Sequence, residues 1–218
     1  MLAHDMRNPL SALLTNIHFV KSVVKQNEPD VEEALSDSAL SCTILSQLIG
    51  NLDVLGRAFL TVLPDPRPTA VRQAAGEAVL RMAAQATLAG IEIRFSPGTH
   101  APTLLVEPNF FGRAIDNLLA NALQYSPAQG HVIIEFDTRD GRGSLIMADS
   151  GPTVPRELRE LVLTGEGQVS AKQRFDARYG RGLGLYCAAQ AARISGAQIA
   201  IGERDGRSWF ELSGPLVV

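Results

Sequence analysis

The stretch HDMRNPL, residues 4–10, belongs to a run of apolar residues whose spacing decides the fold of the N-terminal part of the chain. Apolar residues recur there at alternating three- and four-residue steps, the pattern of a helix that buries one narrow stripe against partner helices. The stripe comprises Ala3, Met6, Leu10, Leu13, Ile17, Val20 and Val24. In this register His4 follows an a position, so we expect its side chain to face solvent.

A second stripe follows a short break in the pattern. Asn27-Glu28-Pro29-Asp30 has the residue types of a turn, so we expect it to separate two helices. The second stripe comprises Leu35, Ser38, Cys42, Leu45, Ile49, Leu52 and Phe59. A two-helix hairpin has too little apolar surface to bury by itself. We therefore predict that two copies of the hairpin form a four-helix bundle.

Prolines at positions 64, 66 and 68 divide the chain, because no helix can run through them. We predict a helical hairpin at residues 1–62, a linker at 63–68 and a second domain at 69–218. In the second domain, periodicity predicts helices at 70–89, 109–125, 155–163 and 183–195, a loop at 164–182, and strands at 91–95, 104–106, 132–138, 144–148, 198–201 and 208–212. This alternation predicts an α+β sandwich with helices on one face of a mixed sheet.

The composition is that of an ordinary soluble globular protein, with 45% hydrophobic and 20% charged residues among 218. A net charge of -3 gives no electrostatic reason to expect nucleic acid or an anionic membrane as a partner. The two cysteines, Cys42 and Cys187, lack CxxC spacing, so they predict neither a disulfide framework nor a zinc site. No apolar run approaches about 18 residues and no signal peptide is recognisable, so we expect a cytoplasmic segment without membrane contact. Its helical pattern begins without a cap, which suggests that an upstream part is missing.

Four stretches carry residues suited to chemistry, and two of them are on predicted helices. Asp5 can orient the His4 ring by accepting a proton from one imidazole nitrogen, which leaves the other nitrogen as a nucleophile. His18 occupies the same heptad position as His4, the b position that follows a, and is interpreted as a surface residue. Asn117 and Asn121 are four residues apart, so they share a helix face where amide oxygens suit Mg²⁺. Surface or capping residues are the alternative for this asparagine pair.

Two further stretches lie at the ends of predicted elements. Asp149-Ser150-Gly151-Pro152 follows a strand, where a carboxylate can accept a hydrogen bond from an exocyclic amine; a plain turn is the alternative. Gly180-Arg181-Gly182-Leu183-Gly184-Leu185 opens a helix, and its glycines let backbone N–H groups face phosphate oxygens. The second stretch is not a Walker A loop, because no lysine followed by serine or threonine comes after it. It also lacks the preceding strand and the glycine spacing of a dinucleotide fingerprint.

In their order and separation these stretches resemble the transmitter region of sensor histidine kinases of two-component systems. HDMRNPL resembles the H box of that family, NLLANALQYSP its N box, DSGP its first glycine box and GRGLGL its second glycine box. The resemblance covers essentially the whole chain. It implies a Bergerat-type, or GHKL, ATP-binding fold for the second domain.

The resemblance also implies a role for each matching residue. His4 would accept the phosphoryl group, and Asp5 would orient and deprotonate the His4 imidazole. Asn8 would position a water for a phosphatase reaction. The implied ATP-binding residues are Asn117, Asn121, Gln124, Tyr125, Asp149, Gly151, Gly180, Gly182, Leu183 and Gly184. Asn121, with Asn117 in support, would hold Mg²⁺. Residues 164–179 would form the ATP lid.

The function that the resemblance implies is that of a homodimeric kinase, which phosphorylates His4 with ATP and transfers the phosphoryl group to an aspartate on a response regulator. Three positions depart from the family pattern. Thr153 stands where a second glycine is usual, Gln124 where lysine or arginine is frequent, and Phe175 is all that remains of a phenylalanine-rich box. They leave open an alternative, a weak or inactive scaffold that docks a receiver domain, and a third reading, a non-kinase ATPase of the same superfamily.

Overall fold

The structure, a computed structural model, describes residues 2–23, 29–59, 65–98, 100–167 and 183–217. Two compact units, Met1–Gly56 and Arg57–Val218, make up the chain. The predicted domain limits stay a prediction, but the stretch 63–68 is not a linker throughout. Strand β1, Arg67–Ala70, begins inside it.

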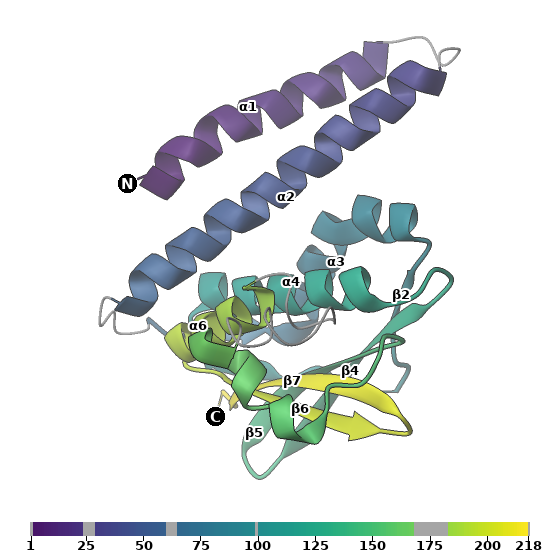
Figure 1. The fold of residues 1–218 in the computed structure, drawn as a ribbon. Helices are drawn as coiled ribbons and strands as arrows, with labels where there is room; N and C mark the ends of the chain where they lie inside the picture. Colours follow the sequence, from purple (N-terminus) through teal and green to yellow (C-terminus); the bar gives the residue numbers. More distant parts are fainter. Residues whose placement is uncertain (1, 24–28, 60–64, 99, 168–182, 218) are drawn as a thin grey trace. The chain divides into compact units, whose positions relative to one another are not determined.

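The first unit is a pair of helices, α1 (Leu2–Val23) and most of α2 (Pro29–Phe59), as Figure 1 shows. Helix α2 begins within the predicted turn, at a proline, which is well suited to the first turn of a helix because its missing N–H is not needed there. The residues that bury a common core are Leu10, Ile17, Cys42 and Ile49, with Leu14, Leu35 and Ala39 partly buried beside them. The unit therefore has a small apolar core from both helices.

Only part of each predicted stripe belongs to this core. On α1, Leu13 is 50% exposed and Val20 is 39% exposed, while Leu10 and Ile17 are buried. A helix in a pair turns one side to its neighbour, so the rest of the stripe stays uncovered. On α2 four neighbouring uncovered apolar residues, which we call the outer stripe of α2, are Ile44, Leu45, Leu48 and Leu52, and Phe59 at the end of the helix is exposed as well.

Within α2, the segment Glu33–Phe59 is long and apolar enough to cross a bilayer, by length and composition alone. This differs from the expectation that no segment approaches that length. The reason is that the outer stripe adds apolar residues to those of the hairpin core. An apolar helix face that pairs with another helix passes the same test as a membrane span.

The second unit is built on a five-stranded sheet of order β2-β4-β5-β7-β6. Its strands are β2 (Glu92–Phe95), β4 (His131–Arg139), β5 (Arg142–Asp149), β6 (Gln198–Arg204) and β7 (Arg207–Pro215). Strand β2 pairs parallel with β4, and the other pairs are antiparallel. The sheet is therefore mixed, as predicted.

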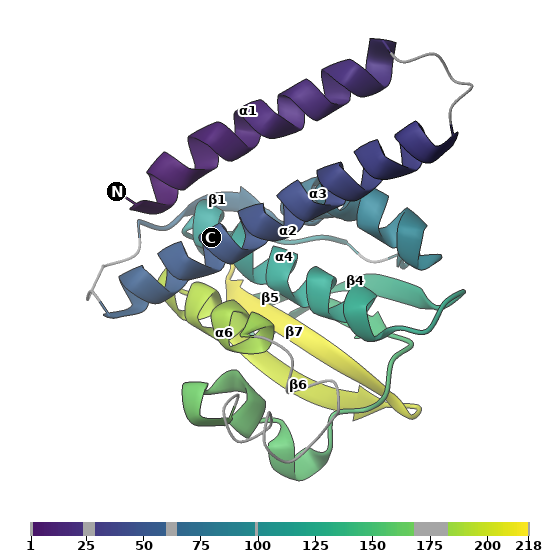
Figure 2. The same cartoon turned by 45° about the horizontal axis from the view of Figure 1, so that its top comes forward.

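Three helices cover one face of this sheet: α3 (Val71–Ala89), α4 (Pro108–Tyr125) and α6 (Gly184–Ser195) (Figures 1 and 2). Alternation along β4 places Val132, Ile134 and Phe136 in the core beneath them. Helix α3 ends at Gly90, which has the left-handed φ of 64° that a helix C-terminus favours. The predicted α+β sandwich with helices on one face of a mixed sheet is confirmed.

Two predictions for the second unit are wrong. β1 pairs antiparallel with β3 (Thr103–Val106) in a separate two-stranded sheet that sequence reasoning missed. The helix expected at 155–163 is instead two three-residue 3₁₀ segments, η1 (Arg156–Leu158) and η2 (Leu161–Leu163). Val162 is their only buried residue, so these segments lack the apolar face that stabilises a longer helix. Of the loop expected at 164–182, residues 165–167 are helical and 168–182 lie outside the described residues.

Candidate functional site

Helix α4 carries a polar pair inside an otherwise apolar face. The Glu107 carboxylate caps the helix by accepting a hydrogen bond from the Phe110 N–H at 2.7 Å. About two and three turns after Phe110, Asn117 and Asn121 are each only 8% exposed. Buried amides are costly without partners, so their presence here indicates a use beyond packing.

The two amides differ in their partners. The Asn117 side-chain N–H donates to the backbone carbonyl of Arg113 at 2.9 Å, which fixes the orientation of that side chain. The Nδ2 atom of Asn121 is buried and has no hydrogen-bond partner among the described residues. An amide left in this state is satisfied when a ligand supplies the missing partner.

Asp149 ends strand β5 and is 1% exposed. Its Oδ1 atom accepts a hydrogen bond from the Gly151 N–H at 2.8 Å, so the chain turns immediately after the carboxylate. Gly151 is buried as well. A carboxylate held in this way keeps a fixed direction, which suits it to accept a hydrogen bond from a ligand amine.

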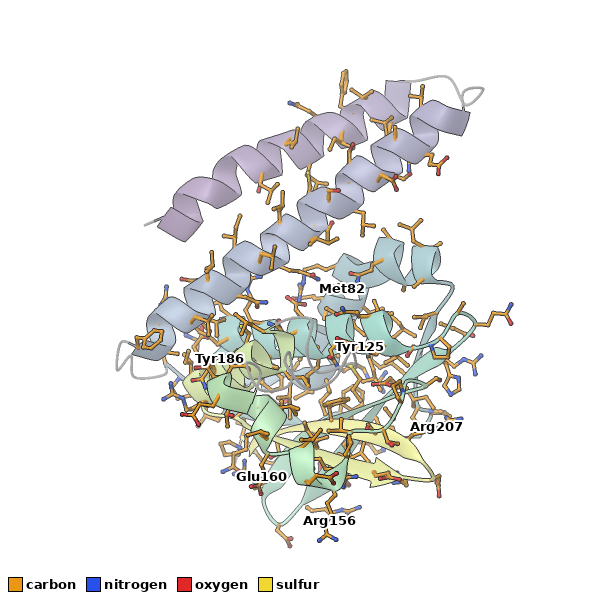
Figure 3. All side chains as sticks on the ribbon, in the orientation of Figure 1. Met82, Tyr125, Arg156, Glu160, Tyr186 and Arg207 are labelled. Atoms are coloured by element: carbon orange, nitrogen blue, oxygen red, sulfur yellow. The ribbon has the colours of Figure 1, made fainter. Side chains whose placement is uncertain are left out.

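The remaining described residues of the predicted site lie at two helix ends. Tyr125 is the half-buried last residue of α4, and Gln124 beside it is exposed (Figure 3). Leu183 is 42% exposed and precedes Gly184, where α6 begins. A Cβ atom added to Gly184 would meet no atom of the described residues within 4 Å outside the backbone of its own helix, so these residues leave the start of α6 open to a close approach. An open helix N-terminus suits phosphate oxygens.

The elements that carry the described parts of three of the four predicted motifs pack together, because α4 packs against α6 and contacts β5. The fourth motif lies in the other unit: His4, Asp5 and Asn8 are in the helical backbone of α1, and their side chains are outside the described part of the chain. Gly180 and Gly182 also lie outside it, as does Phe175. His18 on α1 is exposed, as predicted.

Side chains that sequence reasoning missed hold the backbone around Asp149. The Ser150 hydroxyl bonds to the backbone of His131, and the Ser208 hydroxyl accepts a hydrogen bond from the Val154 N–H at 2.7 Å. Arg159 donates to the carbonyl of the same Val154 at 3.1 Å. The partners of Ser150 and Ser208 are far apart in sequence, so the only local signal for them was a serine directly after a predicted strand-end aspartate.

Two buried ionisable groups lie on the helices of the site. Burial raises the pKa of the Asp116 carboxyl, against the opposing effect of Arg81, which donates to it at 2.8 Å from α3. Burial also raises the pKa of the Cys187 thiol, to about 11. The Arg81 contact ties α3 to α4, and the Cys187 thiol stays protonated and unreactive at neutral pH.

The described residues contain no group of three or more histidine, cysteine, aspartate or glutamate side chains placed to hold a metal ion. A hard cation at this site would therefore depend on amide oxygens and on the oxygens of a bound phosphate. Mg²⁺ is commonly bound in this way, through one or two protein ligands, substrate phosphates and water. The asparagine pair on α4 fits that requirement.

Comparison with known proteins identifies the family of the second domain. Residues 106–217 match the family model described as histidine kinase-, DNA gyrase B-, and HSP90-like ATPase. The adaptive-response sensory kinase SasA of Trichormus variabilis is 23% identical over 230 aligned positions, which cover 99% of this chain and 56% of that protein. The signal transduction histidine-protein kinase/phosphatase MprB of Mycolicibacterium smegmatis is 26% identical, over 92% of this chain and 40% of that protein. The chain thus spans about half the length of the curated relatives it matches.

Solved structures share the fold at low sequence identity. Full-length ShkA in complex with AMPPNP aligns with a TM-score of 0.66 and 21% identity, over 100% of this chain and 45% of that one. The histidine kinase AdeS of Acinetobacter baumannii aligns with a TM-score of 0.61 and 15% identity, over 99% and 98% of the two chains. The likeness extends over the helical hairpin as well as the sheet domain.

Proposed function

Because the chain belongs to the histidine kinase-, DNA gyrase B-, and HSP90-like ATPases and, within them, to the sensor histidine kinases, we propose that it is an ATP-dependent protein kinase that phosphorylates itself on His4. It then transfers the phosphoryl group to an aspartate on the receiver domain of a response regulator. The chain acts as a homodimer, in the cytoplasm.

The observation that carries this proposal is the buried, unpartnered amide nitrogen of Asn121, on the same helix as Tyr125 and within the matched domain. Asn121 and Asn117 hold the ATP phosphates and the Mg²⁺ ion, which shields their charge during phosphoryl transfer. Asp149 accepts the hydrogen bond of the adenine amine, and Tyr125 packs near the base. The start of α6 at Leu183 and Gly184, with Gly180 and Gly182, borders the phosphates.

The reaction is an in-line displacement at the γ-phosphorus of ATP. One ring nitrogen of His4 forms the new bond to phosphorus while the bond to the bridging oxygen breaks and ADP leaves. Asp5 orients the ring and accepts the proton of the other ring nitrogen. A later in-line attack by an aspartate oxygen of the receiver domain returns His4 to its starting state.

Dimerisation is supported by the outer stripe of α2, whose four members are between 43% and 58% exposed. A contiguous apolar helix face of this kind is stabilised when a second helix covers it. Two hairpins joined along these faces make the predicted four-helix bundle. The bundle presents His4 to the ATP-binding domain and to the response regulator.

The test uses γ-labelled ATP with Mg²⁺ and two histidine variants. Label should appear on the wild-type chain, be released by acid as expected for phosphohistidine, and be absent from His4→Ala. His18→Ala is the matched control, since His18 occupies the same heptad position two heptads later on α1 and should keep the label. Acid-stable label, or label that survives in His4→Ala, would overturn the assignment.

We also propose that Asn8 supports dephosphorylation of the response regulator, because it lies one helical turn after His4, where a water can be positioned against the phosphoaspartate. MprB, a kinase/phosphatase by name, is among the relatives. We predict that Asn8→Ala slows dephosphorylation of the regulator about tenfold, the effect of one lost positioning hydrogen bond, while autophosphorylation stays within twofold of wild type. Equal loss of both activities in a coupled assay would contradict this role.

The second candidate is a scaffold that docks a receiver domain without efficient phosphoryl transfer. It is favoured by Gln124, which is exposed where the family often has a cation, and by Thr153 in place of a glycine. Nucleotide binding that disappears in Asn121→Ala, combined with no label on the wild-type chain, would favour this alternative over the kinase.

A further inference from the structure

The pairing between β4 and β5 ends at Val132 and Asp149, yet the next pair of residues is also held together. If the strands continued, the backbone of Ser150 would pair with that of His131. The Ser150 side chain does this instead. Its hydroxyl accepts a hydrogen bond from the His131 N–H at 3.1 Å and donates one to the His131 carbonyl at 3.0 Å.

The Ser150 hydroxyl takes the place of backbone hydrogen bonds that the Ser150 backbone cannot make here. The backbone of Ser150 must leave the sheet so that the Gly151 N–H can reach the Asp149 carboxylate at 2.8 Å. Without the hydroxyl, the edge of β4 at His131 would lose both of these hydrogen bonds where the strand pairing stops. Ser150 therefore lets β5 end directly after Asp149 while the two strands stay in register.

Ser150 also contacts the turn that follows Tyr125. The Gly130 N–H donates to the Pro127 carbonyl at 2.9 Å in that turn. A Cβ atom added to Gly130 would lie 3.3 Å from the Cβ of Ser150 and 2.7 Å from the Pro127 carbonyl oxygen, so the turn packs closely on Ser150. One side chain thus joins the strand end that carries Asp149 to the turn that follows the helix of Tyr125.

We propose that Ser150 is a positioning residue of the nucleotide site, whose hydroxyl sets the direction of the Asp149 carboxylate toward the adenine amine. The inference rests on the proposed function, since it concerns how the ATP site reads the base. Ser150 acts through Asp149 rather than on the base, because its hydroxyl is already bonded to the backbone N–H and carbonyl of His131.

The imidazole of His131 contacts both Ser150 and Arg207. Its Nδ1 atom lies 3.4 Å from the Ser150 hydroxyl, and its Nε2 atom lies 2.9 Å from Nη1 of Arg207, so it is the acceptor there (Figure 3 labels Arg207). The two shorter bonds of Ser150 go to the His131 backbone, however. The backbone contacts, rather than the ring, therefore carry the positioning.

The test measures the affinities of ATP and of inosine triphosphate, which lacks the amine, by calorimetry on the whole chain. Ser150→Ala should weaken ATP binding about five- to tenfold, the effect of one or two lost hydrogen bonds, and weaken inosine triphosphate binding less. The preference for ATP should therefore shrink. Ser150→Thr, which keeps the hydroxyl, should restore both affinities.

Two controls separate positioning from general destabilisation. His131→Ala keeps the backbone partners of Ser150 and should bind ATP within twofold of wild type. Ser213→Ala removes a hydroxyl that lies 3.3 Å from Arg142 at the far end of the same sheet, and should leave the ATP preference unchanged. Hydrogen exchange at the His131 amide provides a readout without nucleotide, and it should be faster in Ser150→Ala.

The outcomes are distinct. Wild-type chain that binds no nucleotide would overturn the proposed function and this inference with it. Wild-type binding with an unchanged ATP preference in Ser150→Ala, or a loss in His131→Ala as large as in Ser150→Ala, would overturn the inference alone. If Ser150→Ala does not fold, hydrogen exchange at the His131 amide of the wild-type chain still tests the inference. Exchange as fast as that of an exposed amide would overturn the inference.

Discussion

Under the proposed function, Asn121 has a side chain whose hydrogen bonds are completed only when nucleotide binds. Its amide nitrogen is buried without a partner among the described residues, on a helix otherwise packed with apolar side chains. Such a group costs about 1–3 kcal/mol of folding stability until a partner is supplied. The cost is therefore paid in the ligand-free protein and is recovered when a ligand supplies the missing hydrogen-bond partner.

This account predicts opposite effects of Asn121→Ala on binding and on stability. ATP affinity should fall at least about tenfold, because the phosphate or Mg²⁺ contact is lost. The melting temperature of the nucleotide-free chain should stay the same or rise. Calorimetry and thermal unfolding measure the two effects, and Asn109→Ala, at an exposed position of the same helix, should leave ATP affinity intact. A lower melting temperature with unchanged ATP affinity would refute the account.

Cys187 makes the free energy of unfolding decrease as the pH rises above about 9. Burial raises the pKa of its thiol from the ordinary value of 9.0 to about 11. As the pH rises, the thiol of the unfolded chain therefore loses its proton before the thiol of the folded chain does. The contribution of the protonated Cys187 thiol to the free energy of unfolding is full below about pH 9 and is lost as the pH rises through about 11. We predict a decrease of about 2 kcal/mol in the free energy of unfolding over this range.

Denaturant unfolding at a series of pH values measures the Cys187 effect. Cys187→Ala should remove that part of the slope between pH 9 and 11, because no thiol remains to titrate. Cys42→Ala is the control and should retain it. A slope in Cys187→Ala equal to that of wild type would assign the pH dependence to other groups.

At the scale of the element, two glycines with different surroundings predict opposite responses to the same substitution. A Cβ atom added to Gly202 on β6 would overlap the indole ring of Trp209 on β7, whereas one added to Gly76 on α3 would meet no atom of the described residues within 4 Å outside the backbone of its own helix. Gly202→Ala should therefore destabilise the domain by about 1–3 kcal/mol. Gly76→Ala should stabilise it by about 0.5–1 kcal/mol, because glycine disfavours a helix interior.

The chain contains one tryptophan, so its fluorescence reports on Trp209 alone. The emission spectrum of folded Gly202→Ala should shift, since the ring must leave its place over β6, and that of Gly76→Ala should not. Unfolding curves provide the stability changes. An unshifted spectrum together with unchanged stability in Gly202→Ala would mean that the ring does not pack on β6.

Most elements of the second domain could be predicted because their signals are local. Gly90 ends α3 with a left-handed φ, and the turns Asp140-Gly141 and Asp205-Gly206 have positive φ at both residues, as aspartate and glycine favour in tight hairpins. The pairing of β1 with β3 could not be predicted, because Arg67-Pro68-Thr69-Ala70 has no alternating pattern and its partner lies more than 30 residues away. Short apolar segments around Val162 have the same composition in a helix as in two 3₁₀ turns.

The candidate site was predictable to a similar extent and for the same reason. Asn117, Asn121 and Asp149 are identifiable because each belongs to a short motif at the end or on the face of an element. The contacts that hold the site have no such motif. Ser208 reaches Val154 across 54 residues of sequence, and Arg81 reaches Asp116 across 35. Such pairs are set by how elements pack, which a single sequence does not specify.

At the scale of the whole molecule, the outer stripe of α2 predicts how strongly two copies associate. Leu48 is 54% exposed at its centre. Leu48→Asn changes both copies in a symmetric dimer and removes about 3 kcal/mol of apolar burial, so the dimer dissociation constant should rise about a hundredfold. Sedimentation equilibrium measures the change.

The control for the dimer is Glu33→Asn, an exposed polar position on the same helix, which should leave the dissociation constant within a few-fold of wild type. Circular dichroism should show that both variants keep their helices. A wild-type chain that stays monomeric at micromolar concentration would rule out the bundle.

The place of β7 in the sheet has a consequence for when the ATP-binding domain forms during synthesis. β7 lies between β5 and β6, although it is the last strand in sequence. β5 has no neighbour on that side until Arg207–Pro215 has been translated, and closing the intervening stretch of more than 50 residues is slow relative to forming a hairpin. The helical hairpin, whose contacts are local, can fold before the sheet is complete. Under the proposed function, the segment that carries His4 is therefore folded before the domain that supplies ATP to it.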